Sequence, residues 1–241
     1  MKKQYHIILL AIAIAVTALS CKKKKPEQPV CRIVKITTPI NTHDISYYSD
    51  GRVQAISTNG NSVRNFNYSE NTIISTTMID GRVDERSIIT LDANGLIVNV
   101  RTETNSTGTA WNNNAYEYSG AQRTRRTFTT SSGTTPWVSN YTWTNGNMIS
   151  ASSPDGVTQY EFHLDKPMQV GDYFGTLSDL LQYGQINIFY KNANLIKSTV
   201  SSGGSHIQNY DYTFDATGKI IAVNTVSGGA NRFTQIEYEC Q

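Results

Sequence analysis

Two histidines of this chain stand beside carboxylates, and such pairs can carry out acid–base catalysis or bind a metal ion. His43 directly precedes Asp44, and His163 is two residues away from Asp165. Residues i and i+2 of a β-strand share a face, so His163 and Asp165 could cooperate if Leu164 continues a strand. A polar pair at the end of a strand gives the same pattern, and we expect this structural role.

The sequence contains no motif of a common enzyme class. It has neither a zinc-binding histidine spacing nor a Gly-x-Ser-x-Gly elbow, and it lacks a P-loop and a dinucleotide fingerprint. The run Asp92-Ala93-Asn94-Gly95 begins like a calcium loop, but the later ligands are missing, so we interpret it as a hairpin turn. We therefore predict a protein that is not an enzyme and that uses neither a metal nor a cofactor.

Polar aromatic residues gather in the middle third of the chain and could stack against a sugar ring. The amide side chains of residues 112–114 stand close by in the sequence and could bind its hydroxyl groups. Half-buried aromatic rings also stabilise cross-strand pairs, and we expect this structural role first. The candidates for ligand contact are Trp111, Trp137, Tyr141 and Trp143.

Cys21 is the residue of the N-terminal region that could be chemically modified. Lys2 and Lys3 precede an apolar run at residues 7–16, and the sequence Ala-Leu-Ser-Cys follows at residues 18–21. The run is shorter than the roughly 20 residues that cross a bilayer, but it fits a secretory signal. The arrangement resembles the signal of a bacterial lipoprotein; an ordinary cleaved signal peptide with a nearby cysteine is the alternative.

This resemblance implies that residues 1–20 are a signal peptide and that Cys21 becomes a lipidated N-terminus, held on a membrane by its acyl chains. Residues 21–30 then form a flexible tether with lysines at 22–25, which could also lie against anionic lipid head groups. Many surface-exposed lipoproteins of Bacteroidetes-type bacteria carry acidic residues after the cysteine. The basic tether therefore favours an outer-membrane lipoprotein that faces the periplasm over one exposed at the surface.

Residues 31–241 are expected to form one domain, and the mature chain that begins at Cys21 has a balanced charge. Without the leader, 19 Lys and Arg stand against 19 Asp and Glu, and this balance argues against a nucleic-acid partner.

Cys31 and Cys240 lie at the two ends of the domain at residues 31–241, and an envelope compartment permits disulfides. We predict that they are bridged if the first and last strands are neighbours; two unpaired cysteines at the chain ends are the alternative.

Short runs of alternating apolar and polar residues follow each other, separated by Asn-Gly and Asp-Gly pairs that favour tight hairpin turns. We expect about 16 strands in one all-β, antiparallel meander that curls into a barrel-like or open twisted sheet. The alternation places Val53 and Ala55 on one apolar face, and Ile220 and Ala222 on another part of it.

One interval breaks this rhythm. Leu177, Leu180 and Leu181 have helical spacing, and Gly184 could end a short helix near residues 176–183. In a β protein such a turn usually plugs the open end of a sheet; a ligand-gating loop is the alternative.

The hairpin pattern resembles known proteins. The run at residues 210–220, Tyr-Asp-Tyr-Thr-Phe-Asp-Ala-Thr-Gly-Lys-Ile, looks like the YD repeats of RHS-type proteins. Residues 31–240 as a whole, with the segments at 164–167, 180–181 and 190–196, resemble a family of Bacteroidetes lipoproteins of unknown function with a porin-like fold. The resemblance implies a barrel-like meander and carries no catalytic residues. The anchor at Cys21 argues against a membrane-spanning porin.

We therefore predict a lipid-anchored envelope protein that acts as a non-enzymatic binding or structural module, for a glycan or for an envelope partner. The alternative is an accessory or docking subunit of an outer-membrane or secretion assembly.

Overall fold

The computed structural model describes residues 30–172, 176–185, 191–202 and 207–240. The chain forms two compact units. The larger unit is Ile33–Glu239, and the smaller one consists of Met1–Arg32 and Cys240–Gln241. Cys21 lies outside the described residues, so the lipid anchor stays a prediction at this point.

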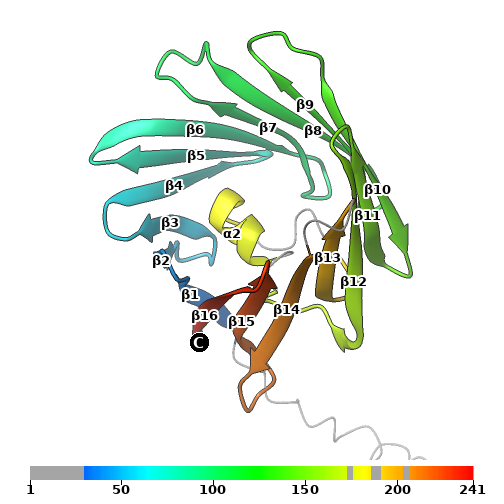
Figure 1. Ribbon diagram of the computed structural model, residues 1–241. Helices are drawn as coiled ribbons and strands as arrows, with labels where there is room; N and C mark the ends of the chain where they lie inside the picture. Colours follow the sequence, from blue (N-terminus) through cyan, green and yellow to red (C-terminus); the bar gives the residue numbers. More distant parts are fainter. Residues whose placement is uncertain (1–29, 173–175, 186–190, 203–206, 241) are drawn as a thin grey trace, which may run out of the picture. The chain divides into compact units, whose positions relative to one another are not determined.

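Sixteen antiparallel strands of the described chain form a closed barrel. Each strand pairs with the next along the chain, and β1 lies beside β16 (Figure 1). The predicted all-β meander is thus confirmed, and its sheet closes rather than staying open. The strands are β1 (Cys31–Thr37), β2 (Thr42–Tyr47), β3 (Val53–Thr58), β4 (Ser62–Ser69), β5 (Thr72–Ile79), β6 (Arg82–Leu91), β7 (Ile97–Glu103), β8 (Trp111–Ser119), β9 (Gln122–Thr130), β10 (Trp137–Thr144), β11 (Asn147–Ser153), β12 (Gly156–Pro167), β13 (Asn194–Ser201), β14 (Ile207–Phe214), β15 (Ile220–Ser227) and β16 (Ala230–Cys240).

Tight turns connect most of these strands, as the Asn-Gly and Asp-Gly pairs predicted. At the turn between β3 and β4, Asn59 has φ 51° and Gly60 has φ 75°. Asn145 and Gly146 repeat these angles, 51° and 78°, between β10 and β11. Two successive residues with positive φ match the right-handed twist of the strands that they join, so each pair specifies a hairpin locally.

Much of the inner face of the barrel is apolar. Ile45 of β2 lies directly opposite Ile56 of β3, and both side chains are buried. The inward residues of the other strands extend this surface into one hydrophobic cluster. Its largest fully buried members include Phe66, Ile73, Ile89, Ile97, Ile220 and Val223.

The outer face is polar and charged. Asp44, next to the inward Ile45, points outward and lies 3.8 Å from Lys35 on β1. Further outer ion pairs join Arg86 to Glu103 and Arg125 to Glu117. An Arg or Lys on the lipid face of a membrane barrel costs about 2–4 kcal/mol at the bilayer midplane. The outer face therefore suits a barrel surrounded by water.

β-Bulges beside the turns change which residues face inward, so the predicted alternation is wrong at these positions. Ser46 pairs with Ala55 while Tyr47 pairs with Val53, so one residue of β3 is skipped. An extra residue reverses the two-residue period of the side chains. Consequently Ile56, rather than Ala55, continues the apolar face that begins at Val53. The same shift lies between Thr213 and Phe214 of β14, where Val223 replaces Ala222 on the inner face.

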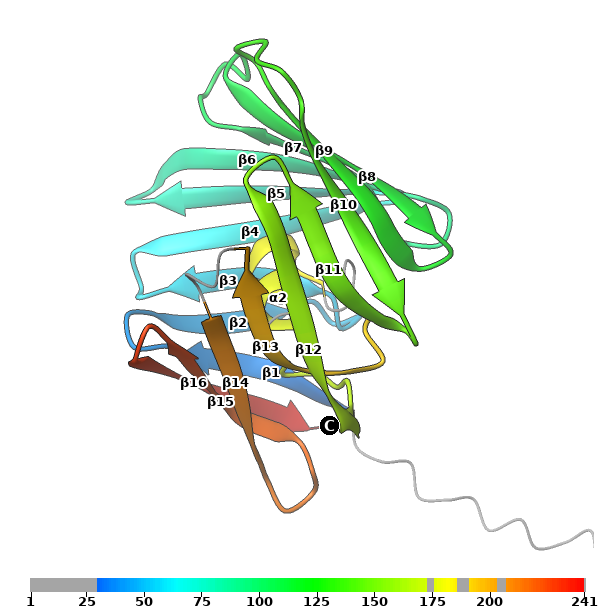
Figure 2. The same ribbon diagram turned by 45° about the vertical axis from the view of Figure 1, so that its right-hand side comes forward.

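The short helix α2 (Ser178–Tyr183) lies within the ring of strands (Figure 1), and β12 passes in front of it in Figure 2. Leu177, Leu180 and Tyr183 belong to the hydrophobic cluster of the barrel. Gly184 ends the helix as predicted, with φ 67° and its N–H donated to the carbonyl of Leu180. A Cβ at this position would lie 2.8 Å from Phe66, so both the backbone angle and the space require glycine.

Polar contacts fix the ends of this helical segment. Arg64 of β4 donates to the carbonyl oxygens of Leu181 and Gln182, at 3.3 and 3.1 Å. Before the helix, the buried carboxylate of Asp172 accepts a hydrogen bond of 2.6 Å from the hydroxyl of Tyr212. No helix among the described residues is long and apolar enough to cross a membrane.

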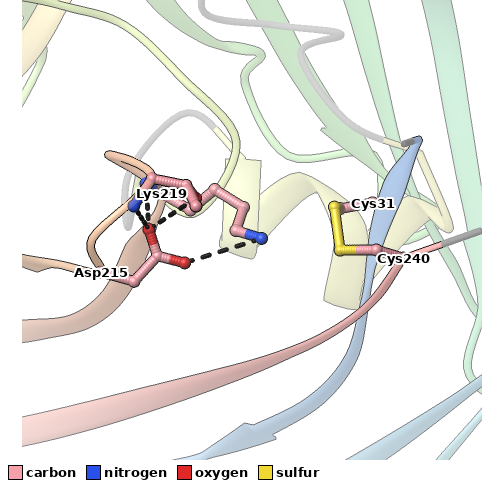
Figure 3. Close-up of a disulfide and its surroundings, with 5 residues drawn as sticks. Cys31, Asp215, Lys219 and Cys240 are labelled. Carbon is pink, nitrogen blue, oxygen red and sulfur yellow. Dashed lines mark hydrogen bonds and ion pairs between the residues drawn. A yellow bond between two sulfur atoms is a disulfide. The ribbon is translucent and has the colours of Figure 1, made fainter. Parts of the chain in front are cut away.

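The smaller unit contains a disulfide between Cys31 and Cys240, which are 209 residues apart in sequence (Figure 3). Cys31 is the first residue of β1 and Cys240 the last residue of β16. The predicted condition is met, since the first and last strands are neighbours in the sheet.

Candidate functional site

The four aromatic residues singled out in the sequence do not form one platform. Trp111 is on the outer face of β8, opposite Glu103, and the guanidinium carbon of Arg101 lies 4.8 Å from the centre of its ring. Trp137 and Tyr141 alternate with outward residues of β10 and lie on its inner face, as Ser139 between them is buried. Ligand contact by these residues stays a prediction, but a shared sugar platform of all four is not assembled.

Trp143 has a definite structural partner. Its indole Nε1–H donates a hydrogen bond of 2.8 Å to the carbonyl oxygen of Arg123. Arg123 is the residue beside the bulge of the preceding hairpin, where the register shifts between Glu117 and Tyr118. A bulge disrupts the ladder and leaves a backbone group without its strand partner. The indole therefore donates to a backbone carbonyl oxygen beside the bulge, where the strand ladder is interrupted.

Two tyrosines repeat this arrangement in other hairpins. The hydroxyl of Tyr118 donates to the carbonyl of Ile97 at 2.7 Å, and that of Tyr238 donates to the carbonyl of Ile220 at 2.8 Å. Ile97 and Ile220 also stand beside register shifts. Burial raises the pKa of both tyrosines, so their hydroxyls remain protonated donors. The recurring aromatic residues thus reinforce a repeated turn and bulge.

The aspartates of the turns have a structural role as well. In the predicted hairpin turn at residues 92–95, Asp92 Oδ1 accepts the N–H groups of Asn94 and Leu96, at 2.9 and 2.8 Å. Asp215 Oδ1 accepts the N–H groups of Thr217 and Lys219 at 2.8 and 3.0 Å, and the Asp215–Lys219 contacts are drawn in Figure 3. These carboxylates are used by the backbone of their own turns.

Strand geometry separates the pair His43 and Asp44, whereas Leu164 continues β12 between His163 and Asp165. His43 and Asp44 are consecutive in β2 and therefore point to opposite faces. The ring of His163 donates through Nε2 to the carbonyl of Tyr210 at 3.4 Å, which places its described contact on β14. Its neighbour Asp165 is exposed. No cluster of three or more metal-ligating side chains occurs within the part of the chain that the structure describes.

A cavity of about 690 Å³ inside the barrel is the strongest candidate for a functional site. It lies between α2 and the inner faces of two strand groups, β1 to β5 and β14 to β16. One part of its wall is aliphatic, with Ile36, Ile56, Leu177 and Leu181. Its size is within the roughly 300–1,000 Å³ that is common for small-molecule sites.

The remaining wall is polar. Arg64 and Arg232 both line the cavity, and no carboxylate is among its described lining residues. Arg64 is already engaged, because its guanidinium contacts Thr77 Oγ1 at 3.0 Å and Glu85 Oε1 at 3.4 Å, besides the carbonyls of α2. Arg232 is exposed at the cavity wall and has no ion pair among the described residues.

His43 lines the same cavity, and its Nδ1 lies 2.9 Å from Thr58 Oγ1. Burial lowers the pKa of His43, although the carboxylate of Asp44 acts in the opposite direction. The imidazole is therefore neutral at pH 7 and adds hydrogen-bonding capacity rather than charge to the cavity.

Thr225 is a cavity residue whose hydroxyl lacks a hydrogen-bond partner among the described residues. Its side chain is only 3% exposed, yet Oγ1 has no hydrogen-bond partner among the described residues. A buried polar atom without a partner costs about 1–3 kcal/mol. Such an atom at a cavity wall indicates a place where a water molecule or a ligand supplies the missing hydrogen bond.

Sequence reasoning missed this cavity. Its residues come from eight strands and the helical segment, and no local motif connects them. One signal was present: some positions on the inward face carry polar residues. Arg64 stands two residues before Phe66, and Thr225 stands two residues after Val223. These interruptions mark a polar inner wall once the inward face is known.

Comparisons with known proteins support the fold. No protein-family model matches the chain, and no curated protein matches it by sequence. Solved structures do match, among them a porin-like protein from Bacteroides uniformis ATCC 8492. The two chains share 14% identity, with a TM-score of 0.63 over 86% of this chain and 96% of that chain. At this identity the likeness concerns the fold alone: the chain is similar in architecture to a porin-like protein.

Proposed function

We propose that this protein is a lipid-anchored, non-enzymatic binding protein of the bacterial cell envelope, and that it holds a small ligand inside its barrel. The observation that carries the proposal is the cavity of about 690 Å³ with the buried, unpartnered hydroxyl of Thr225 in its wall. A binding site for a small molecule is typically such an apolar cavity with a few directed polar groups.

The interior and the exterior of the barrel support binding over conduction. Transmembrane β-barrels combine an apolar outer band with a polar lumen. Here ion pairs such as Arg86–Glu103 and Arg125–Glu117 lie on the outer face, while an aliphatic cluster and α2 occupy much of the inside, together with a few charged side chains such as Arg64 and Arg123. The envelope location rests on the lipoprotein-like sequence at residues 18–21, and the fold of a porin-like protein is in keeping with it. The basic tether favours the periplasmic side of the outer membrane.

Blocking the cavity tests the binding proposal. Ser62 is half-buried in the cavity wall, so Ser62→Trp should fill the space, while Ser119→Trp adds the same bulk at an exposed position of β8. We expect native mass spectrometry of protein purified from envelopes to show a bound small molecule on the wild type and on S119W, but not on S62W. Circular dichroism verifies that both variants fold. Absence of any adduct on all three proteins would contradict a bound ligand.

Cys21→Ser tests the anchor separately. We expect the wild-type protein in the membrane fraction and the variant in the soluble envelope fraction, because the acyl chains are lost with the thiol. The substitution Lys25→Ser in the same tether serves as the control, because it leaves the thiol of Cys21 in place. Membrane association of C21S equal to that of the wild type would argue against lipidation at this residue.

A further inference from the structure

We propose that the ligand of the cavity is a small amphipathic anion with an aliphatic body. Its charged group binds a polar corner formed by Gln208, Thr225 and Arg232, and its body lies against the aliphatic wall of Ile36, Ile56, Leu177 and Leu181. This inference rests on the proposed function, since it names the class of ligand for the same cavity.

The strand register assembles the polar corner. Thr225 of β15 lies directly opposite Arg232 of β16, and on its other side it pairs with Tyr210 of β14. Gln208 is two residues before Tyr210 and therefore shares its inward face. Three neighbouring strands thus present a guanidinium, a hydroxyl and an amide to one part of the cavity, and each of these groups can donate hydrogen bonds.

The hydrogen-bonding state of the corner points to an acceptor. Thr225 Oγ1 is buried without a partner among the described residues, and Arg232 has no carboxylate beside it there. A carboxylate, sulfate or phosphate oxygen is a strong acceptor for both groups. A charged ammonium group would instead meet like charge from the guanidinium. The corner therefore selects a negatively charged group.

The second arginine of the cavity does not compete for this role. Arg64 already contacts Glu85, Thr77 and the last carbonyls of α2. Its charge is compensated and its donors are directed at the protein. Arg232 is thus the described cavity cation whose charge is available to a ligand, and it fixes the end of the cavity where the anionic group binds.

The rest of the cavity determines the body of the ligand. Ile36, Ile56, Leu177 and Leu181 offer aliphatic surface, whereas no Phe, Tyr or Trp is among the described lining residues. Sugars and nucleobases are commonly held by stacking on large aromatic rings, and the imidazole of His43 is the one ring among these lining residues. An alkyl chain gains from the burial of each methylene group without a need for stacking.

Three probes of equal chain length test the charge preference: decanoate, decan-1-ol and decyltrimethylammonium, each kept below the concentration at which it aggregates. We expect titration calorimetry on the full mature chain to give an affinity for decanoate at least about tenfold above those of the neutral and cationic probes, because a charge-assisted hydrogen bond is worth about 1.5–3 kcal/mol, that is, a factor of ten or more. Equal affinities for decanoate and decan-1-ol would overturn the anion inference and leave a cavity that binds apolar molecules. Absence of binding by all three probes would overturn it as well, and the envelope adduct measured with S62W then decides separately whether the proposed function stands.

Variants of the corner locate the interaction. Arg232→Gln should weaken decanoate binding about tenfold or more and leave decan-1-ol binding unchanged. Arg82→Gln removes an exposed arginine of β6 outside the cavity and should change neither affinity. An unchanged affinity of R232Q for decanoate would show that the anion does not bind at this corner.

Thr225→Val adds a readout that does not depend on charge. Valine has nearly the shape of threonine and lacks the unpartnered hydroxyl, so the free variant should have a higher Tm than the wild type. The same variant should bind decanoate several-fold more weakly, because the hydroxyl donor is lost. A lower Tm together with unchanged binding would contradict the assigned role of Thr225.

Discussion

At the scale of single residues, most of the conspicuous polar groups of this chain serve its own backbone. The indole of Trp143 and the hydroxyls of Tyr118 and Tyr238 satisfy carbonyl oxygens beside bulges. The carboxylates of Asp92 and Asp215 organise their turns. Thr225 differs from all of these, since its hydroxyl is buried at a cavity without a described partner. The exception is more informative about function than the abundant aromatic residues.

The turn at Asp215 predicts a defined acid sensitivity. The hydroxyl of Thr217 and then the N–H of Lys219 lower the pKa of Asp215 to about 2, from an ordinary value of 3.8. A carboxylate with a lowered pKa in the folded state stabilises the protein fully above its unfolded pKa, and this contribution is lost as the pH falls through the folded pKa. The contribution should therefore disappear between about pH 4 and pH 2.

Asp215→Asn removes this contribution. Urea unfolding of the variant should show a shallower loss of stability over that pH interval than the wild type, with the two proteins converging at the acidic end. Asp211→Asn, an exposed change on the outer face of β14, is the control. Parallel pH profiles of wild type and D215N would show that Asp215 is not coupled to folding.

At the scale of the elements, the segment of α2 belongs both to the hydrophobic core and to the wall of the cavity. Its apolar side chains pack inside the barrel. Leu181 of the helix and Leu177, the residue before it, form one wall of the cavity. Its position is determined by Phe66 against Gly184 and by Arg64 at its last carbonyls. The helix is therefore both a core element and part of the candidate binding site, which agrees with the predicted plug.

Leu180→Ala tests the plug. Leu180 is 1% exposed inside the barrel, and truncation of a buried leucine costs about 2–5 kcal/mol of unfolding free energy. Leu164→Ala is the matched control, because Leu164 is 79% exposed on β12 and should change stability little. Both are measured by equilibrium urea unfolding. A loss in L180A no larger than that in L164A would show that α2 is not packed into the barrel.

At the scale of the whole molecule, one chain of hairpins closes on itself around a largely apolar interior with a polar cavity wall. Antiparallel pairing of successive strands needs only local turns, while closure brings β1 beside β16. A closed barrel leaves no free sheet edge that could pair with another chain. The disulfide of Cys31 with Cys240 joins residues near the two ends of the described chain.

The disulfide should contribute strongly to stability. In the chain-entropy model, cross-linking residues this far apart stabilises a fold by about 5 kcal/mol. We expect the double variant Cys31→Ala, Cys240→Ala to unfold at a markedly lower urea concentration than the wild type under oxidising conditions. Under reducing conditions the two midpoints should coincide. A titration of the unreduced mature protein that finds two free thiols would contradict the bridge.

The sequence by itself determined the elements that local chemistry specifies. The Asn-Gly and Asp-Gly turns, the alternating strands between them, the short helix that ends at Gly184 and the number of strands were all predictable, because each depends on neighbouring residues. The pattern Asp-x-x-Gly, at residues 92–95 and 215–218, also predicted the turns at Asp92 and Asp215. The lipoprotein-like segment before Cys21 belongs to the same kind of local signal and awaits its own test.

Only the tertiary structure decided which residues share a surface. A bulge of one residue reverses the inward and outward faces, so Ile56 and Val223 took the places predicted for Ala55 and Ala222. Closure of the sheet then brought β14 to β16 to the same cavity as β1 to β5, and joined Thr225, Arg232 and α2 around it. These contacts depend on register and on residues far apart in sequence, and the alternation within a single hairpin contains no information about either.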